Sequence, residues 1–119
     1  TNPTINGFSG TGNASVTGVL TSSGNIFGVQ TLTGPGTINV TTTVTLLVTT
    51  GTDAYSLPNG TEGQLKIISM KTNGGNGTVT PDNFINGTSI LFNNVEDTVI
   101  MLYQSTGWVL IARQNATVS

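Results

Sequence analysis

The chain has 119 residues, only three of them Lys or Arg and five Asp or Glu, and it contains neither cysteine nor histidine. This composition excludes disulfides, thiolate metal sites and imidazole-based catalysis. A net charge of −2, with no cluster of bases, argues against nucleic acid as a partner, and no apolar run approaches the roughly 20 residues of a membrane span.

β-Branched residues dominate the composition. Thr, Val and Ile supply 43 residues, whereas Ala supplies four and Glu two. Because β-branched side chains suit a pleated sheet and good helix formers are scarce, the sequence predicts an all-β fold. Sheet edges are normally protected by charges or prolines. This chain has few of either, so we expect identical copies to cover its edges, with a closed barrel as the alternative.

Residues 1–40 alternate short apolar groups with turns rich in Gly, Asn, Ser and Thr. The apolar groups are Val16 with Val19–Leu20, Ile26–Phe27 with Val29, Leu32, and Ile38 with Val40. One such unit has too few apolar residues to form a core alone. The spacing therefore predicts a shaft of short β repeats that is intertwined or stacked.

From residue 41 the sequence pattern changes, because the apolar segments become longer. We expect strands at 41–50, 64–72, 88–92, 97–104 and 107–113, separated by turns rich in Gly, Asn and Pro. The last two are joined by Ser105-Thr106-Gly107, which predicts a hairpin. Their side chains are apolar on both faces, which predicts cover from another sheet or another subunit.

The stretch GGNGTVTPDNFINGTS, residues 74–89, is expected to be a turn-rich connector. Its Gly and Asn residues let the backbone reverse cheaply. Phe84 and Ile85 are expected to fix the connector to the core.

The later two thirds of the chain carries a longer pattern of turns and strands. Its elements are Leu57-Pro58, Gly60 to Gln64, Thr78 to Pro81, Phe84, Gly87 to Ile90, Glu96-Asp97 and Gly107 to Val109. This pattern, over about residues 55–112, resembles a module found near the C-termini of tail-fibre and spike-like structural proteins of phages and large DNA viruses.

The resemblance implies a shaft-like segment, residues 1–40, leading into a head, residues 41–119, built as an antiparallel β-sandwich or β-prism. It also implies a homotrimer on the virion surface that attaches to a glycan or protein receptor of the host cell, with the rest of the fibre or spike upstream. Pro58, Gly60 and Gly63 would shape a turn, and Trp108 would plug the head.

The aromatic residues are the best candidates for ligand binding. Tyr103, Trp108 and Tyr55 are expected to stack on a sugar face, with Asp82 supplying hydrogen bonds. For Trp108 a core or intersubunit position is the favoured alternative, because so large a side chain is usually buried. The alternative function is a monomeric secreted carbohydrate-binding or adhesin domain.

The charged residues give no pattern typical of catalysis. Glu96-Asp97 is expected in a solvated turn, and Lys66 and Lys71 on opposite faces of one strand, both solvated. Asp53 and Asp82 carry oxygen ligands suited to calcium, but no EF-hand loop or calcium-binding repeat is present. The sequence therefore predicts no enzyme, no metal site and no cofactor.

Six Asn-x-Ser/Thr triplets are candidate glycosylation sites, which only a eukaryotic secretory route would use. They begin at Asn13, Asn39, Asn59, Asn76, Asn86 and Asn115.

Overall fold

The computed structural model describes residue 12 and residues 14–119, and this part of the chain is all-β, as predicted. It contains ten strands and no helix. The strands are β1 (Val29–Thr33), β2 (Gly36–Thr37), β3 (Val44–Val48), β4 (Asp53–Leu57), β5 (Leu65–Thr72), β6 (Gly77–Pro81), β7 (Ile90–Phe92), β8 (Thr98–Gln104), β9 (Gly107–Gln114) and β10 (Thr117–Val118).

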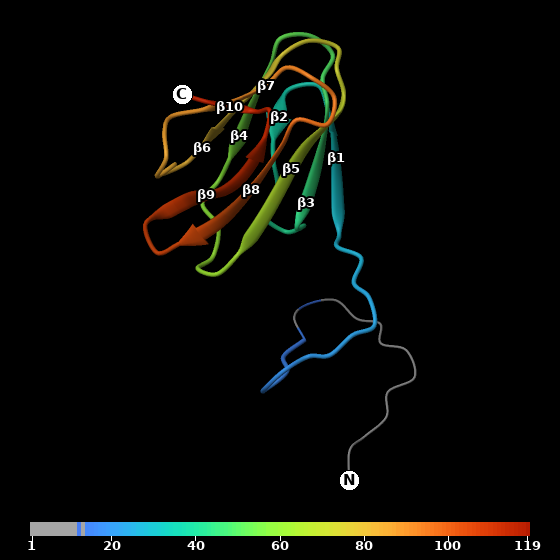
Figure 1. Ribbon diagram of the computed structural model, residues 1–119, viewed down its shortest axis with the longest axis vertical. Helices are drawn as coiled ribbons and strands as arrows, with labels where there is room; N and C mark the ends of the chain where they lie inside the picture. Colours follow the sequence, from blue (N-terminus) through green and yellow to red (C-terminus); the bar gives the residue numbers. More distant parts are fainter. Residues whose placement is uncertain (1–11, 13) are drawn as a thin grey trace.

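The strands form two packed sheets, so the predicted sandwich is confirmed (Figure 1). Sheet A has the order β1-β3-β5-β8-β9, and sheet B has the order β10-β7-β6-β4-β2. Through β6, odd-numbered strands lie in sheet A and even-numbered strands in sheet B. The chain thus crosses from one sheet to the other after each of the first five strands.

The first six strands stack as three rungs, each rung being one strand of sheet A followed by one of sheet B. Strands β1, β3 and β5 pair in parallel, as do β2, β4 and β6. Parallel neighbours need a crossover connection, and here the other sheet provides it. The prediction of an antiparallel sandwich is therefore wrong for this half of the fold.

Antiparallel pairing is confined to the C-terminal half. Strands β8 and β9 form the predicted hairpin and extend sheet A from β5, while β7 and β10 extend sheet B from β6. The hairpin register shifts between Ile100 and Met101. This half closes the stack of rungs at the end farthest from β1.

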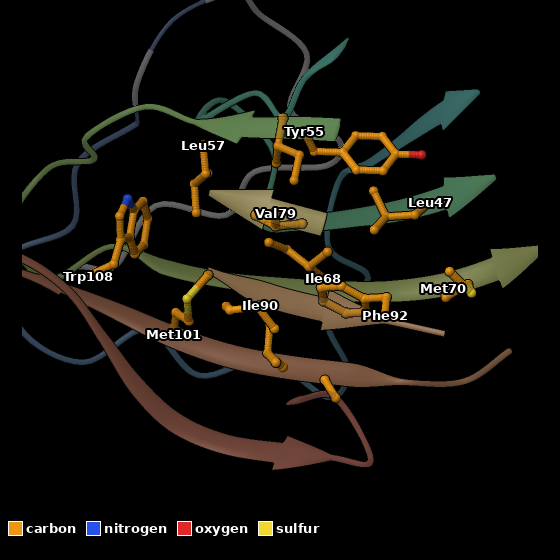
Figure 2. Close-up of a cluster of buried hydrophobic side chains, with 13 residues drawn as sticks. Leu47, Tyr55, Leu57, Ile68, Met70, Val79, Ile90, Phe92, Met101 and Trp108 are labelled. Atoms are coloured by element: carbon orange, nitrogen blue, oxygen red, sulfur yellow. The ribbon is translucent and has the colours of Figure 1, made fainter. Parts of the chain in front are cut away.

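The core lies between the two sheets, and Figure 2 shows its side chains converging from both. Inward positions alternate with outward ones along each strand, as a period of two requires. The fully buried apolar residues include Leu47, Ile68, Val79, Phe92 and Trp108.

The predicted boundary between shaft and head at residue 40 differs from the structure. Strands β1 and β2 belong to the same two sheets as the rest. Before Val29 the described residues form no strand, and the chain extends away from the sheets (Figure 1). The predicted shaft repeats of residues 1–11 and 13 lie outside the described residues.

The predicted connector at 74–89 contains a strand instead, since Gly77–Pro81 forms β6 in the middle of sheet B. Its alternating Val79 and Pro81 are buried, a period-two signal that the surrounding glycines obscured. Phe84 packs against the core as expected, but Ile85 is exposed. The glycines before β6 allow close packing, because a Cβ on Gly75 would meet the backbone of Gly51.

Replacing Trp108 with Ala should lower the free energy of unfolding by about 3–5 kcal/mol, the usual loss for a buried Trp. The side chain is fully buried and its Nε1 donates to the Pro58 carbonyl over 2.9 Å. Urea titration followed by circular dichroism measures the change. Trp108→Phe, which keeps an aromatic ring, should lose less. An equal loss in both variants would mean that the hydrogen bond, not the ring, holds this end of the core.

Candidate functional site: an uncharged sheet face and a loop cluster

The outer face of sheet A carries an apolar row that crosses all five strands, and the neighbouring row, Thr31, Leu46, Ser69, Thr98 and Gln114, is mostly polar. Residues that pair side by side across the sheet form one continuous row: Val29, Val44, Ile67, Ile100 and Ala112. Next to this row lie Leu46, Val48, Leu65, Leu102, Val109 and Ile111. Their neighbours along the strands, such as Leu47, Ile68 and Val99, are in the core. The period of two therefore directs the row itself away from the core.

The apolar row carries no ionised side chain, and Arg113 is the one cation that lines a cleft beside it. The strands of sheet A contain three charged residues, Lys66, Lys71 and Arg113. Lys66 points into the core, and Lys71 lies at the end of β5, where the register with β3 shifts. Arg113 pairs with the inward-facing Val99, and its Nη1 donates to the Ala116 carbonyl. None of the three lies in the apolar row.

Sheet B presents a different surface. Its outward positions include Thr37, Ser56, Thr78, Thr80 and Thr117, with Leu91 as the large apolar exception. Hydroxyl groups hydrate readily, so this face suits contact with water. The two faces of the sandwich therefore differ in kind. Nothing in the described part of the chain covers the face of sheet A.

The apolar face is large enough to matter energetically. Five strands about 4.8 Å apart and about five residues long, at 3.3 Å each, span roughly 400 Å². This area includes the polar Thr31, Ser69 and Thr98, and the largest apolar patch of a typical monomer, about 300–600 Å², is often functional. Beside the register shift of the hairpin the face is hollowed into a cleft of about 270 Å³, lined by Thr98, Ile100, Ala112, Arg113 and Gln114.

Lys66 lies in a polar network inside the sandwich, so the prediction that it is solvated is wrong. Its Nζ donates to the Thr42 carbonyl over 2.9 Å and lies 3.4 Å from Asn39 Oδ1. Gln30 Oε1 accepts from the Asn39 amide and from the Thr45 hydroxyl. Lys66 turns inward because its strand neighbours Ile67 and Leu65 take the outer face.

Burial lowers the pKa of Lys66 from 10.5 to about 8 because the ammonium loses its hydration. The hydrogen-bond partners of the ammonium are all neutral oxygens. In contrast, Lys71 is exposed as predicted. The odd spacing of the two lysines thus separates them correctly, but it does not show which one turns inward.

A second feature is the cluster of loops 58–63, 82–86 and 104–107 at one end of the core. Trp108 joins them, because its indole donates to the Pro58 carbonyl and its amide to the Asn83 carbonyl. The Asn83 side chain donates to Asn59 Oδ1 over 3.1 Å. The three loops thus form one surface around a buried ring.

Three of the four predicted ligand-binding residues lie in or beside this loop cluster: Asp82 in a loop, Tyr103 on β8 and Trp108 on β9. Trp108 is fully buried, the alternative considered for it, and Tyr103 packs edge-on against it with ring centroids 5.1 Å apart. Tyr103 is half-buried and Asp82 is exposed. Tyr55 is buried at the opposite end of the core (Figure 2), where burial, and then the nearby Asp53, raise its pKa to about 12. Only Tyr103 and Asp82 are therefore accessible to a ligand.

Two of the acidic residues, Asp53 and Asp97, accept hydrogen bonds from backbone amides in turns. Glu96 is exposed, in a turn as predicted, but Asp97 is fully buried, so its predicted solvation is wrong. Asp97 Oδ2 accepts from the amides of Asn93 and Asn94, and Asp53 Oδ2 accepts from the Thr50 amide. Short carboxylates bind nearby backbone amides in this way, a role that spacing alone did not indicate.

The candidate glycosylation sites differ in accessibility. Asn13 lies outside the described residues, and Asn59, Asn76, Asn86 and Asn115 are exposed. Asn39 is half-buried, and its Oδ1 accepts from Thr42 within the network of Lys66.

Among residue 12 and residues 14–119, no group of three or more Asp and Glu side chains is placed to hold a metal ion. The same residues include no helix with the length and apolar character needed to cross a membrane. No protein-family model matches the chain, and a search of curated proteins also gives no match.

The lowered pKa of Lys66 predicts that the stability of the fold increases with pH above about 8. Between pH 8 and 10.5 the unfolded chain keeps the lysine proton and the folded chain does not. The free energy of unfolding should therefore rise with pH, by at most about 1.4 kcal/mol per unit. Because the raised pKa of Tyr55 acts in the opposite direction above pH 10, urea titrations between pH 8 and 10 isolate the effect.

Lys66→Met should abolish this rise, whereas Lys71→Met, which removes an exposed lysine from the same strand, should retain it. A rise that persists in Lys66→Met would show that another group causes it.

Proposed function

We propose that this chain is a structural and attachment module that works as a homotrimer at the end of a virion fibre or spike. The observation that carries the proposal is the uncharged, apolar row on the outer face of sheet A. A free monomer would leave this face in water. Packing of copies against one another would remove the apolar row from water and so would stabilise the assembly.

The absence of charge favours identical copies as the partner. In an assembly of identical copies every interface contains the same residues, so an unpaired charge would be repeated in each interface and would disfavour association. The row from Val29 to Ala112 has no such group. Interfaces between different proteins gain specificity from charge pairs, which this face cannot supply.

The sheet A face alone is smaller than a standard interface, so associated copies would have to bury more than this face. A standard interface buries about 800 Å² on each partner, about twice the flat area of the sheet A face. The extended segment before β1 adds exposed apolar residues, among them Leu20, Ile26 and Phe27. The number of copies, three, rests on the resemblance to fibre proteins.

Attachment to the host is assigned to the loop cluster, which would be repeated in each copy. Tyr103 supplies an aromatic edge and Asp82 an exposed carboxylate at the same end of the fold. Such a site is small, and its single-copy affinity for a glycan or protein receptor would be low. Three linked sites raise the overall affinity without new contacts.

Self-association is tested by matched substitutions on the central strands of the two sheets. Ile67 and Thr78 are both half-buried, outward-facing residues, one on β5 and the other on β6. Ile67→Glu should convert the assembly to a monomer of 12.2 kDa in sedimentation velocity, because it places a charge in each copy of the interface. Thr78→Glu should leave the assembly intact. Wild-type protein that stays monomeric up to high concentration would overturn the proposal.

Attachment is tested by binding of the assembled protein to host cells or to a glycan array. Asp82→Asn and Tyr103→Ala should each weaken binding by about tenfold or more, since every copy loses the contact at once. Glu96→Gln is the control, because Glu96 lies at the other end of the core, where its amide bonds to Met70. Binding that is unchanged by assembly would favour a monomeric carbohydrate-binding domain instead.

A further inference from the structure

The free edge of β1 is an unprotected strand edge. Strand β1 pairs only with β3, in parallel and without a register shift. It contains no charged residue and no proline. At the other edge of sheet A, β9 has a register shift and Arg113. Natural sheets protect their edges with charges, prolines and register shifts or by pairing with another strand. The edge of β1 has none of the first three, so it is a site where another strand can pair.

The sequence just upstream resembles the rung formed by β1 and β2. Val16-Thr17-Gly18-Val19-Leu20-Thr21 matches Leu32-Thr33-Gly34-Pro35-Gly36-Thr37 at a distance of 16 positions, with Thr, Gly and Thr identical. In sheet A the first two rungs are 15 positions apart, Val29 pairing with Val44. The upstream repeat therefore has nearly the spacing of an established rung.

The two glycines also share a backbone conformation. Gly34 turns the chain from sheet A to sheet B with a φ of 73°, and its amide donates to the Val48 carbonyl. Gly18 has a φ of 106°, in the left-handed region that glycine adopts without strain. A positive φ, which the corner after β1 uses at Gly34, is therefore already present at Gly18.

In this register the apolar residues of the segment face the core. Val16 would lie beside Leu32, which packs against the core. Leu20 would lie beside Gly36, whose Cβ direction points at the Leu32 side chain. Thr17 and Thr21 would lie beside the exposed Thr33 and Thr37. Residues 22–28 would return the chain to β1, as residues 38–43 return it to β3.

We infer that residues 14–21 form a further rung on the edges of β1 and β2 of their own chain once copies have associated. This inference rests on the proposed self-association. In the single chain Val16 and Leu20 are exposed, because two apolar side chains bury too little to offset the entropy of ordering the segment. In this register Ser15 and Thr17 would lie on the outer face beside Thr31 and Thr33, so association would cover the new strand through polar contacts and hold it on the edge of β1.

Hydrogen exchange of the full chain, read by mass spectrometry above and below the association concentration, tests the inference. Amides of residues 14–21 should exchange at least tenfold more slowly in the assembly than in the monomer. Val16→Asp should abolish this protection, because the carboxylate would point into the core. Val19→Asp is the matched control, since Val19 would occupy the exposed corner position of Pro35, and it should keep the protection.

The outcomes separate the two proposals. If sedimentation finds an assembly in which residues 14–21 exchange freely, the further rung is wrong and self-association stands. Equal loss of protection in Val16→Asp and Val19→Asp would also overturn the rung, because the register would be different. A chain that stays monomeric overturns the proposed function itself.

A cysteine pair shows whether the rung comes from the same chain. The protein has no cysteine, and neighbouring residues on paired strands lie within disulfide distance. Thr17→Cys with Thr33→Cys should form an intramolecular disulfide in the assembly, with monomer mass on a non-reducing gel. Thr17→Cys with Thr78→Cys, on the face of sheet B, should stay reduced. Covalent dimers from the first pair would overturn the assignment to the same chain.

Discussion

Sheet A has apolar side chains on both faces, but sheet B can cover only one of them. This constraint follows from the period of two: Leu47 and Ile68 point into the sandwich, so Leu46 and Ile67 must point out. Sheet B avoids the problem because its outward positions are mostly Thr and Ser. The difference between the two sheets explains why one face suits water and the other suits a partner.

The stacked rungs add a second constraint at the β1 end. Each open sheet ends in two edge strands, and β9 and β10 are the edges formed by the C-terminal half. The edge at β9 has a register shift and Arg113, whereas the edge at β1 has neither feature. At the other end β1 and β2 remain open, and the chain upstream carries the matching pattern. Strand β1 forms both the open edge of the stack and one side of the uncovered face. A single assembly of copies could therefore cover the edge and the face together.

The buried network of Lys66 shows how this fold accommodates a cation in its interior. The amine is neutral more often than an exposed lysine, because its pKa is lowered to about 8, and carbonyl and amide oxygens bind it from the loop 39–42. That loop is the return connection between the first two rungs. A buried polar group can fix one arrangement among several, and here it ties β5 to the connection that sets the spacing of the stack.

The sequence by itself determined the all-β class, most of the strand positions, the hairpin at 105–107 and the apolar character of both faces of the C-terminal strands. These features are local, since they depend on β-branched residues, turn residues and a period of two. Only the tertiary structure decided that β1 to β6 pair in parallel, that the sandwich begins at Val29, that 77–81 is a strand, and that Lys66 rather than Lys71 is buried. Those features depend on which distant strands pair, and alternation along one strand contains no information about its neighbour.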